Sequence, residues 1–280
     1  MKRPPHDGHA AFPFFMPVSG GERFCLFHPP SQERVPRGSI LYVHPFAEEL
    51  NKSRRMAALQ ARAFAAHGYG VLQIDLYGCG DSSGDLTEAR WHIWREDMML
   101  ACAWLKQRIA GPFSLWGLRL GGLLALDLAC DEAIKLDQVI LWHPVLQGRN
   151  YLDHFFRLRL ANQMVDNETG NHASLPPARK ILACGDSIEV AGYEISPRLV
   201  ADIDAVDATL KMPPIPVRWF EIRSIGGDTV AAHVTRQAER WRSGDVALSL
   251  HIVSGTPFWA ATENLECQSL LETTTTFATS

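Results

Sequence analysis

A chain of 280 residues, 46% of them hydrophobic, is long enough to bury one full core and too apolar to be disordered. Its formal net charge of -4 gives no support for a nucleic-acid partner. The apolar run at 12–16 is short and broken by proline, so we expect no membrane insertion. Scattered cysteines without a CxxC pair predict reduced thiols and a cytoplasmic protein; they are Cys25, Cys79, Cys102, Cys130, Cys184 and Cys267.

Buried-strand and helix patterns alternate along the first half of the chain. The strand patterns lie at 39–43, 69–75, 113–116 and 138–142, and the helical patterns between them at 53–67, 90–109 and 120–130. Such alternation predicts a mostly parallel sheet with right-handed crossovers and helices on both faces.

The regular alternation stops after the fourth strand pattern. Residues from about 147 to 212 have helical and loop patterns, and strand patterns resume at 217–222 and 247–253. We therefore expect a single domain over residues 1–280, with a helical cap inserted at about 147–212 over the C-terminal edge of the sheet. The threonine run at 273–276 is expected to fray.

The segment 113–122, Phe-Ser-Leu-Trp-Gly-Leu-Arg-Leu-Gly-Gly, is the most informative stretch. A strand, a Gly-x-x-x-Gly turn and a helix form a nucleophile elbow, in which the central residue occupies a strained turn at a helix N-terminus. Hydrolases place serine, cysteine or aspartate at that centre, and this chain has Arg119. The two glycines alone would also suit an ordinary tight turn between a strand and a helix.

Two further loops favour the elbow. Residues 43–46, Val-His-Pro-Phe, follow a strand as an oxyanion-hole segment does, although Pro45 donates no N–H and His44 could equally be a packing residue. Residues 75–84, Asp-Leu-Tyr-Gly-Cys-Gly-Asp-Ser-Ser-Gly, match the Asp-x-x-Gly-x-Gly-x-Ser loop of α/β-hydrolases. Together the three segments resemble that superfamily, which implies an α/β-hydrolase fold.

Longer segments resemble a narrower family. They lie at 45–55, 78–85, 117–121, 190–196 and 257–259, and are similar to those of the "hydrolase 2, exosortase A system-associated" family. The resemblance extends over about residues 40 to 260. It implies a bacterial protein that serves exopolysaccharide synthesis and the sorting of PEP-CTERM proteins, and it supplies no substrate.

A serine triad needs a nucleophile, a base and an acid, and this chain lacks two of the three. Arg119 stays protonated and has no lone pair suited to attack. The stretch 253–259, after the last strand pattern, contains no histidine, and we expect His233 and His251 to be structural. Asp228 matches the Gly-x-x-Asp acid loop. We therefore expect little or no serine-type hydrolysis.

Arg119 has two possible roles. With Leu120, His44 and Phe46 it would bind an anion under the cap, because a guanidinium at a helix N-terminus suits carboxylate or phosphate. The ligand would be a carboxylated sugar, a phosphorylated lipid-linked intermediate or the phosphopantetheine of an acyl carrier. Alternatively, the guanidinium forms a buried ion pair; the candidate partners are Glu48, Glu49 and Asp228.

Two other functions stay open. The chain could be an active ester or thioester hydrolase or acyltransferase whose nucleophile has moved to Cys79, Ser82 or Ser83. It could also be a structural partner of the polysaccharide or protein-sorting machinery. Its histidines show no metal-ligand spacing, so we expect neither a metal nor a cofactor.

Overall fold

An eight-stranded sheet forms the centre of this computed structural model. The structure describes residues 11–131, 134–166, 176–223, 230–261, 263 and 265–279. In their order across the sheet, the strands are β1 (Phe12–Val18), β2 (Gly21–His28), β4 (Tyr69–Ile74), β3 (Gly38–Val43), β5 (Phe113–Leu118), β6 (Gln138–Trp142), β9 (Val217–Arg223) and β10 (Leu248–Ser254). From β4 to β10 neighbouring strands are parallel, and β1 and β2 add an antiparallel pair at one edge.

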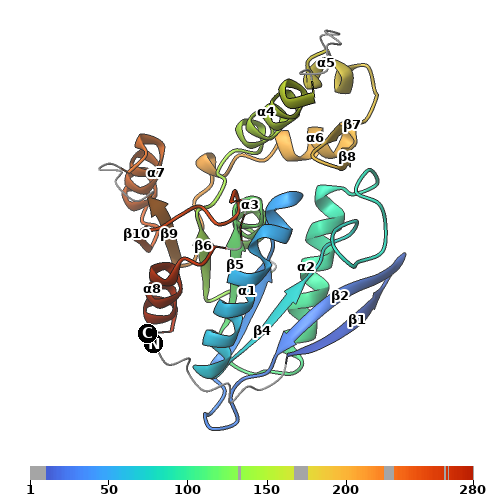
Figure 1. The fold of residues 1–280 in the computed structure, drawn as a ribbon. Helices are drawn as coiled ribbons and strands as arrows, with labels where there is room; N and C mark the ends of the chain where they lie inside the picture. The colour runs from blue at the N-terminus through green and yellow to red at the C-terminus, as the bar shows by residue number, and fades with distance from the viewer. Residues whose placement is uncertain are drawn as a thin grey trace.

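Helices cover both faces of the sheet (Figure 1). On one face lie α1 (Glu48–Ala66) and α8 (Gln268–Ala278), and on the other lie α2 (Trp91–Lys106), α3 (Leu120–Ala129) and α7 (Ala232–Ser243). Every residue of β3 and β5 is buried, as central parallel strands between two helical layers must be. The predicted mostly parallel sheet with helices on both faces is confirmed. Helix α1 begins at Glu48, earlier than the predicted residue 53. The sequence did not indicate this start because no capping side chain marks it.

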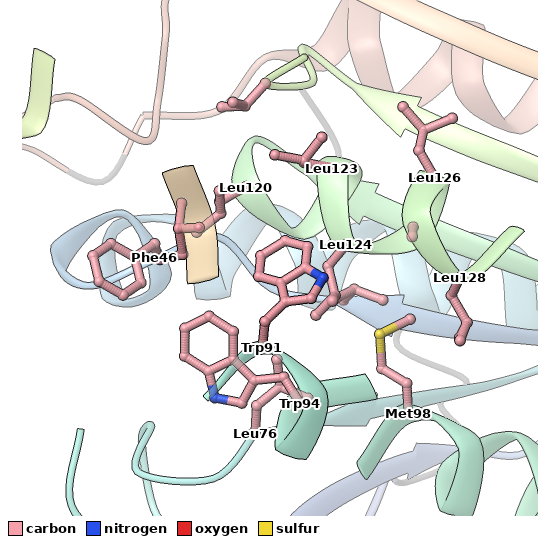
Figure 2. Packing of buried hydrophobic residues seen from close by; sticks show 14 of the residues in the cluster. Phe46, Leu76, Trp91, Trp94, Met98, Leu120, Leu123, Leu124, Leu126 and Leu128 are labelled. Atoms are coloured by element: carbon pink, nitrogen blue, oxygen red, sulfur yellow. The ribbon is translucent and has the colours of Figure 1, made fainter. Parts of the chain in front are cut away.

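Apolar side chains of α2 and α3 pack together on one face of the sheet. Figure 2 shows Trp91, Trp94 and Met98 of α2 among the leucines of α3. All ten residues of α3 are buried, so this helix packs on every side. Burial of each large side chain contributes about 2 kcal/mol to the free energy of folding. The packing of the cluster therefore holds the N-terminus of α3 in a fixed position relative to the sheet.

The segment between β6 and β9 is here called the insertion (147–212), and its described elements lie together at one end of the sheet (Figure 1). Its described elements are α4 (Gly148–Asp166), α5 (Ala178–Ala183), β7 (Ile188–Val190), β8 (Tyr193–Ile195), α6 (Pro197–Asp204) and the short 3-10 helix η2 (Ala208–Leu210). Phe46, in the loop after β3, packs its ring against Tyr151 and Phe155 of α4. The aromatic contacts therefore hold the insertion against the loop that follows β3.

The C-terminal threonines do not fray, which corrects the prediction made from the sequence. They belong to α8, where Leu270, Leu271, Thr274 and Ala278 are buried at helical spacing. Trp142 Nε1 donates a hydrogen bond of 2.8 Å to Thr274 Oγ1. A terminal helix that buries one face and satisfies a core tryptophan is held in place, whatever its poor helix propensity.

Thr274→Val is expected to lower the free energy of unfolding by about 1–3 kcal/mol, because the buried Trp142 N–H would lose its acceptor. The change keeps the side-chain shape and is measured by urea unfolding. Thr276→Val, on the exposed side of the same helix, is the control and should shift stability by less than about 0.5 kcal/mol. Equal losses in both variants would contradict the assigned role of Thr274.

No described helix combines the length and the hydropathy that crossing a bilayer requires.

Candidate functional site

The turn between β5 and α3 has the strained geometry of a nucleophile elbow. Arg119 has φ 54° and ψ -119°, a conformation that a non-glycine residue rarely adopts. Its N–H donates to Trp142 O at 3.1 Å, and its carbonyl accepts from Val145 N at 3.1 Å. A Cβ added to Gly121 would lie 2.3 Å from Val43 O, so helix and strand approach too closely for any side chain. The backbone therefore forms the elbow predicted from the sequence, with arginine at its centre.

The Arg119 side chain forms an ion pair within the protein. Its Nε donates to Glu49 Oε1 at 3.2 Å, and the two side chains are only 15% and 12% exposed. Tyr151 OH donates to the second oxygen, Glu49 Oε2, at 3.2 Å. Burial raises the pKa of Glu49, and the neighbouring guanidinium opposes that shift. Of the acidic partners considered from the sequence, Glu49 is the one that Arg119 contacts, and Asp228 lies outside the described residues.

The rest of the guanidinium has few contacts within the part of the chain that the structure describes. Nη1 reaches His143 O at a long 3.5 Å, so three of the five N–H donors have no acceptor among the described residues. Cζ lies 5.7 Å from the centre of the Tyr151 ring and 5.3 Å from that of the Trp259 ring. Trp259 follows the last strand, in the stretch 253–259, which contains no histidine. Aromatic faces beside a cation hold it in place without neutralising it.

Arg119 lines a pocket of about 490 Å³. Its described ionisable side chains come from the β5–α3 turn, the residue after β6, α4, β9 and α7, and are Arg119, His143, Tyr151, His154, Glu221, His233 and Arg236. Two of these side chains are permanently positive, so the pocket favours anions. Among the described residues, no group of three His, Cys, Asp or Glu side chains is placed to hold a metal ion.

A histidine and a glutamate meet in this pocket. His143 Nδ1 lies 3.0 Å from Glu221 Oε1, and Trp219 Nε1 donates to Glu221 Oε2 at 2.9 Å. Burial raises the pKa of Glu221 to about 7. Burial, together with the nearby charge of Arg119, lowers the pKa of His143 to about 3. Neither residue was predicted for this site from the sequence, although a glutamate within a buried strand was a signal.

The other residues expected to bind a ligand have structural contacts. His44 Nδ1 donates to Pro45 O at 2.7 Å and its Nε2 accepts from Leu76 N at 3.2 Å, so neither ring nitrogen is left for a ligand. Phe46 and Leu120 are buried in the apolar cluster with Trp91 and Trp94 (Figure 2). The cavity there measures only about 10 Å³, and these three residues do not line the larger pocket.

The proposed alternative nucleophiles lie in the loop after β4. Ser82 Oγ donates to Asp75 O at 2.5 Å and accepts from Phe24 N at 2.9 Å. Ser83 Oγ accepts from Glu22 N at 3.0 Å. Both hydroxyls thus hold the loop to β2. Cys79 lines a separate pocket of about 660 Å³, and burial strongly raises the pKa of its thiol.

Cys79 is expected to resist alkylation by iodoacetamide in the native protein, because a buried thiol with a raised pKa supplies almost no thiolate at neutral pH. Cys184 is exposed and serves as the internal control that should react. Peptide mass mapping after timed labelling measures both sites, and denatured protein should label at both. Rapid native labelling of Cys79 would revive the displaced-nucleophile mechanism.

Comparison with known proteins assigns the family. The chain matches the family model Hydrolase_4, described as serine aminopeptidase S33, over residues 34–194, more than half of its length. The chain belongs to this family. No curated protein matches it in sequence. Although the family is described as serine aminopeptidases, this chain has Arg119 at the centre of its elbow.

Solved structures of esterases and hydrolases have the same fold. Est1E from Butyrivibrio proteoclasticus, with bound ferulic acid, is 16% identical with a TM-score of 0.63 and coverage of 95% of this chain and 97% of that one. A thermostable carboxyl esterase from Bacillus coagulans is 14% identical with a TM-score of 0.67, covering 96% and 98%. An α/β serine hydrolase homologue from Coxiella burnetii is 12% identical with a TM-score of 0.57, covering 93% and 95%. This Hydrolase_4 chain therefore has the α/β-hydrolase fold, and such low identities carry nothing further.

Proposed function

We propose that this chain binds an anionic ligand through Arg119 and performs little or no serine-type hydrolysis. The observation that carries the proposal is the guanidinium at the centre of the elbow, directed into a pocket of about 490 Å³. Arginine cannot attack a carbonyl, but its forked N–H donors suit carboxylate and phosphate. The Glu49 contact uses Nε alone, so ion pairing and ligand binding are compatible.

The ligand carries a carboxylate or a phosphate beside groups that form hydrogen bonds. Gln147, Asn150 and Thr209 contribute amides and a hydroxyl to the pocket, and Arg236 adds a second cation. A carboxylated sugar, a phosphorylated lipid-linked intermediate and phosphopantetheine all have this chemistry. In the cell, we place the chain in the cytoplasm, as a partner of the exosortase A, PEP-CTERM and exopolysaccharide system, on the strength of the sequence resemblance at 45–55 and 190–196.

An ester hydrolase with a displaced nucleophile has less support. The hydroxyls of Ser82 and Ser83 are engaged in holding the loop, and the thiol of Cys79 is buried with a raised pKa. A nucleophile needs an adjacent base or a lowered pKa. None of the three residues has a histidine as a hydrogen-bond partner among the described residues.

Isothermal titration calorimetry with glucuronate, glucose 1-phosphate and phosphopantetheine tests the proposal. The control protein is the double variant Arg119→Gln with Glu49→Gln, which removes both charges while an amide pair can still form. We expect at least one anion to bind wild type at low salt, with affinity falling by about tenfold or more in the double variant. Neutral glucose should bind neither protein. Absence of binding by all three anions, or equal binding by both proteins, would contradict the proposal and leave the structural-partner role.

A further inference from the structure

His143 and Glu221 are brought together by neighbouring parallel strands. His143 directly follows β6, and its N–H donates to Phe220 O of β9 at 2.8 Å, which places its ring beside the next residue, Glu221. His143 has φ 42°, a second non-glycine residue with left-handed backbone in the same pocket as Arg119. Strained backbone of this kind is retained where the surrounding structure requires a particular side-chain position.

The contacts at His143 Nδ1 allow the shared proton to sit on either partner. When Glu221 is protonated, its hydroxyl donates to Nδ1, which also accepts the longer 3.3 Å contact from Ile222 N. When Glu221 is ionised, Nδ1–H donates to the carboxylate, and the contact from Ile222 N is given up because a protonated Nδ1 cannot accept. Trp219 fixes the other oxygen of Glu221, so the pairing atom stays the same in both states. His143 Nε2 has no hydrogen-bond partner among the described residues, and the side chain is 25% exposed in the pocket.

The acid–base properties of the two groups suit transfer of a single proton. Glu221, with its pKa raised to about 7, gains and loses a proton near neutrality. His143, with its pKa lowered to about 3, resists becoming a cation, because it is buried beside Arg119. A proton taken up at Nε2 is therefore matched by release of the Nδ1 proton to Glu221, and the imidazole stays neutral throughout.

Among the described residues, the pocket offers no activated side-chain nucleophile, which leaves water as the nucleophile. The two hydroxyl side chains in its described lining are already donors within the protein, Tyr151 to Glu49 and Thr209 to Asp207. Both acceptors are carboxylates, and neither hydroxyl has the histidine partner of a serine-type nucleophile among the described residues. His143, in contrast, lines the pocket with no described hydrogen-bond partner at Nε2 and with Glu221 paired to Nδ1, the arrangement that general-base catalysis needs.

We propose that His143 and Glu221 form a proton relay that activates water to hydrolyse esters bearing a carboxylate, held by Arg119. This inference rests on the proposed function for recognition of the anion. Water gives one proton to His143 Nε2 as Nδ1–H passes to Glu221, and the hydroxide oxygen bonds to the ester carbonyl carbon. The bond from that carbon to the leaving oxygen then breaks, and the leaving oxygen takes the proton from Nε2 while Glu221 returns its own to Nδ1. The products are an acid and an alcohol, with no covalent enzyme intermediate.

Several other charged or titratable groups face this pair. Among the described residues they come from α1, the β5–α3 turn, α4 and α7, and are Glu49, Arg119, Tyr151, His154, His233 and Arg236. Arginines do not titrate in the neutral range, and burial beside Arg236 lowers the pKa of His233. The pH dependence expected from Glu221 is therefore identified by substituting Glu221 itself.

The test compares mono(4-nitrophenyl) adipate with the neutral 4-nitrophenyl hexanoate, which has the same acyl length. We expect wild type to turn over the adipate ester with kcat/KM about tenfold or more above that of the neutral ester. His143→Gln and Glu221→Gln should each lower kcat about 100-fold or more and change KM little. The wild-type rate should rise through about pH 7 as Glu221 ionises, and Glu221→Gln should lose this dependence.

Failure of the relay can be told from failure of anion binding. Calorimetry with adipate itself measures binding in wild type and in both variants, and binding without turnover would overturn the relay alone. Nitrogen NMR of the His143 ring, assigned with His143→Gln, gives a second measurement. We expect neutral tautomers to exchange between Nε2–H and Nδ1–H across neutrality in wild type. A single tautomer over that range, or equal turnover by Glu221→Gln, would also overturn the proposal.

Discussion

Arg119→Met is expected to lower the free energy of unfolding by about 3 kcal/mol at neutral pH and by much less in mild acid. Methionine keeps a linear side chain and the same backbone strain, so the lost interaction is the ion pair. Glu49 would remain with its side chain only 12% exposed and with one donor among the described residues, the hydroxyl of Tyr151. In such variants, most of the lost free energy of unfolding comes from the carboxylate that stays buried without its cation.

The pH dependence follows from the raised pKa of Glu49. Burial already raises it, and removal of Arg119 raises it further. Because the folded pKa then lies well above the unfolded one, the folded state binds more protons between the two values, and stability falls as pH rises through that range. Urea unfolding at acidic and neutral pH measures the difference. The double variant Arg119→Met with Glu49→Met should recover much of the loss, and a loss independent of pH would contradict this account.

Gly121→Ala is expected to cost about 3 kcal/mol or more, or to prevent folding, because overpacking against rigid backbone cannot relax. The added Cβ would lie 2.3 Å from Val43 O and 2.4 Å from His44 O, where the first turn of α3 meets the end of β3. Val43 ends β3, and His44 is the first residue of the loop that follows it beside the elbow. The variant would therefore lose the elbow geometry as well as stability, and thermal unfolding with circular dichroism measures the effect.

Gly122→Ala, one residue further along α3, is the matched control. Its Cβ would approach Pro144 Cβ to 3.0 Å, a side-chain contact that a small shift can relieve. Alanine also gains about 1 kcal/mol of helix propensity over glycine, so we expect a net change within about 1 kcal/mol. Similar losses in both variants would show that the close approach at Gly121 is not what the fold depends on.

Patterns local in sequence predicted the central parallel strands, the helices between them and the elbow. Buried strands at 39–43 and 69–75, the helices after them and the elbow around Arg119 each carry their signal in adjacent residues, as periodicity or as glycine spacing. The hairpin of β1 and β2 was not predicted, and the threonine helix at the C-terminus was taken for a frayed tail. Both are stabilised by distant contacts that propensity does not record, such as Trp142 with Thr274.

The sequence by itself determined that a residue unable to act as a nucleophile stands at the centre of a hydrolase elbow, because chemistry at one position is a property of that residue. Only the tertiary structure decided what surrounds it. Glu49, Tyr151 and Glu221 reach Arg119 or its pocket from α1, α4 and β9, separated from it by as many as 102 residues of chain. Pairing between such positions depends on how helices and strands pack, and a pKa depends on the burial that packing creates, so neither can be read from neighbouring residues.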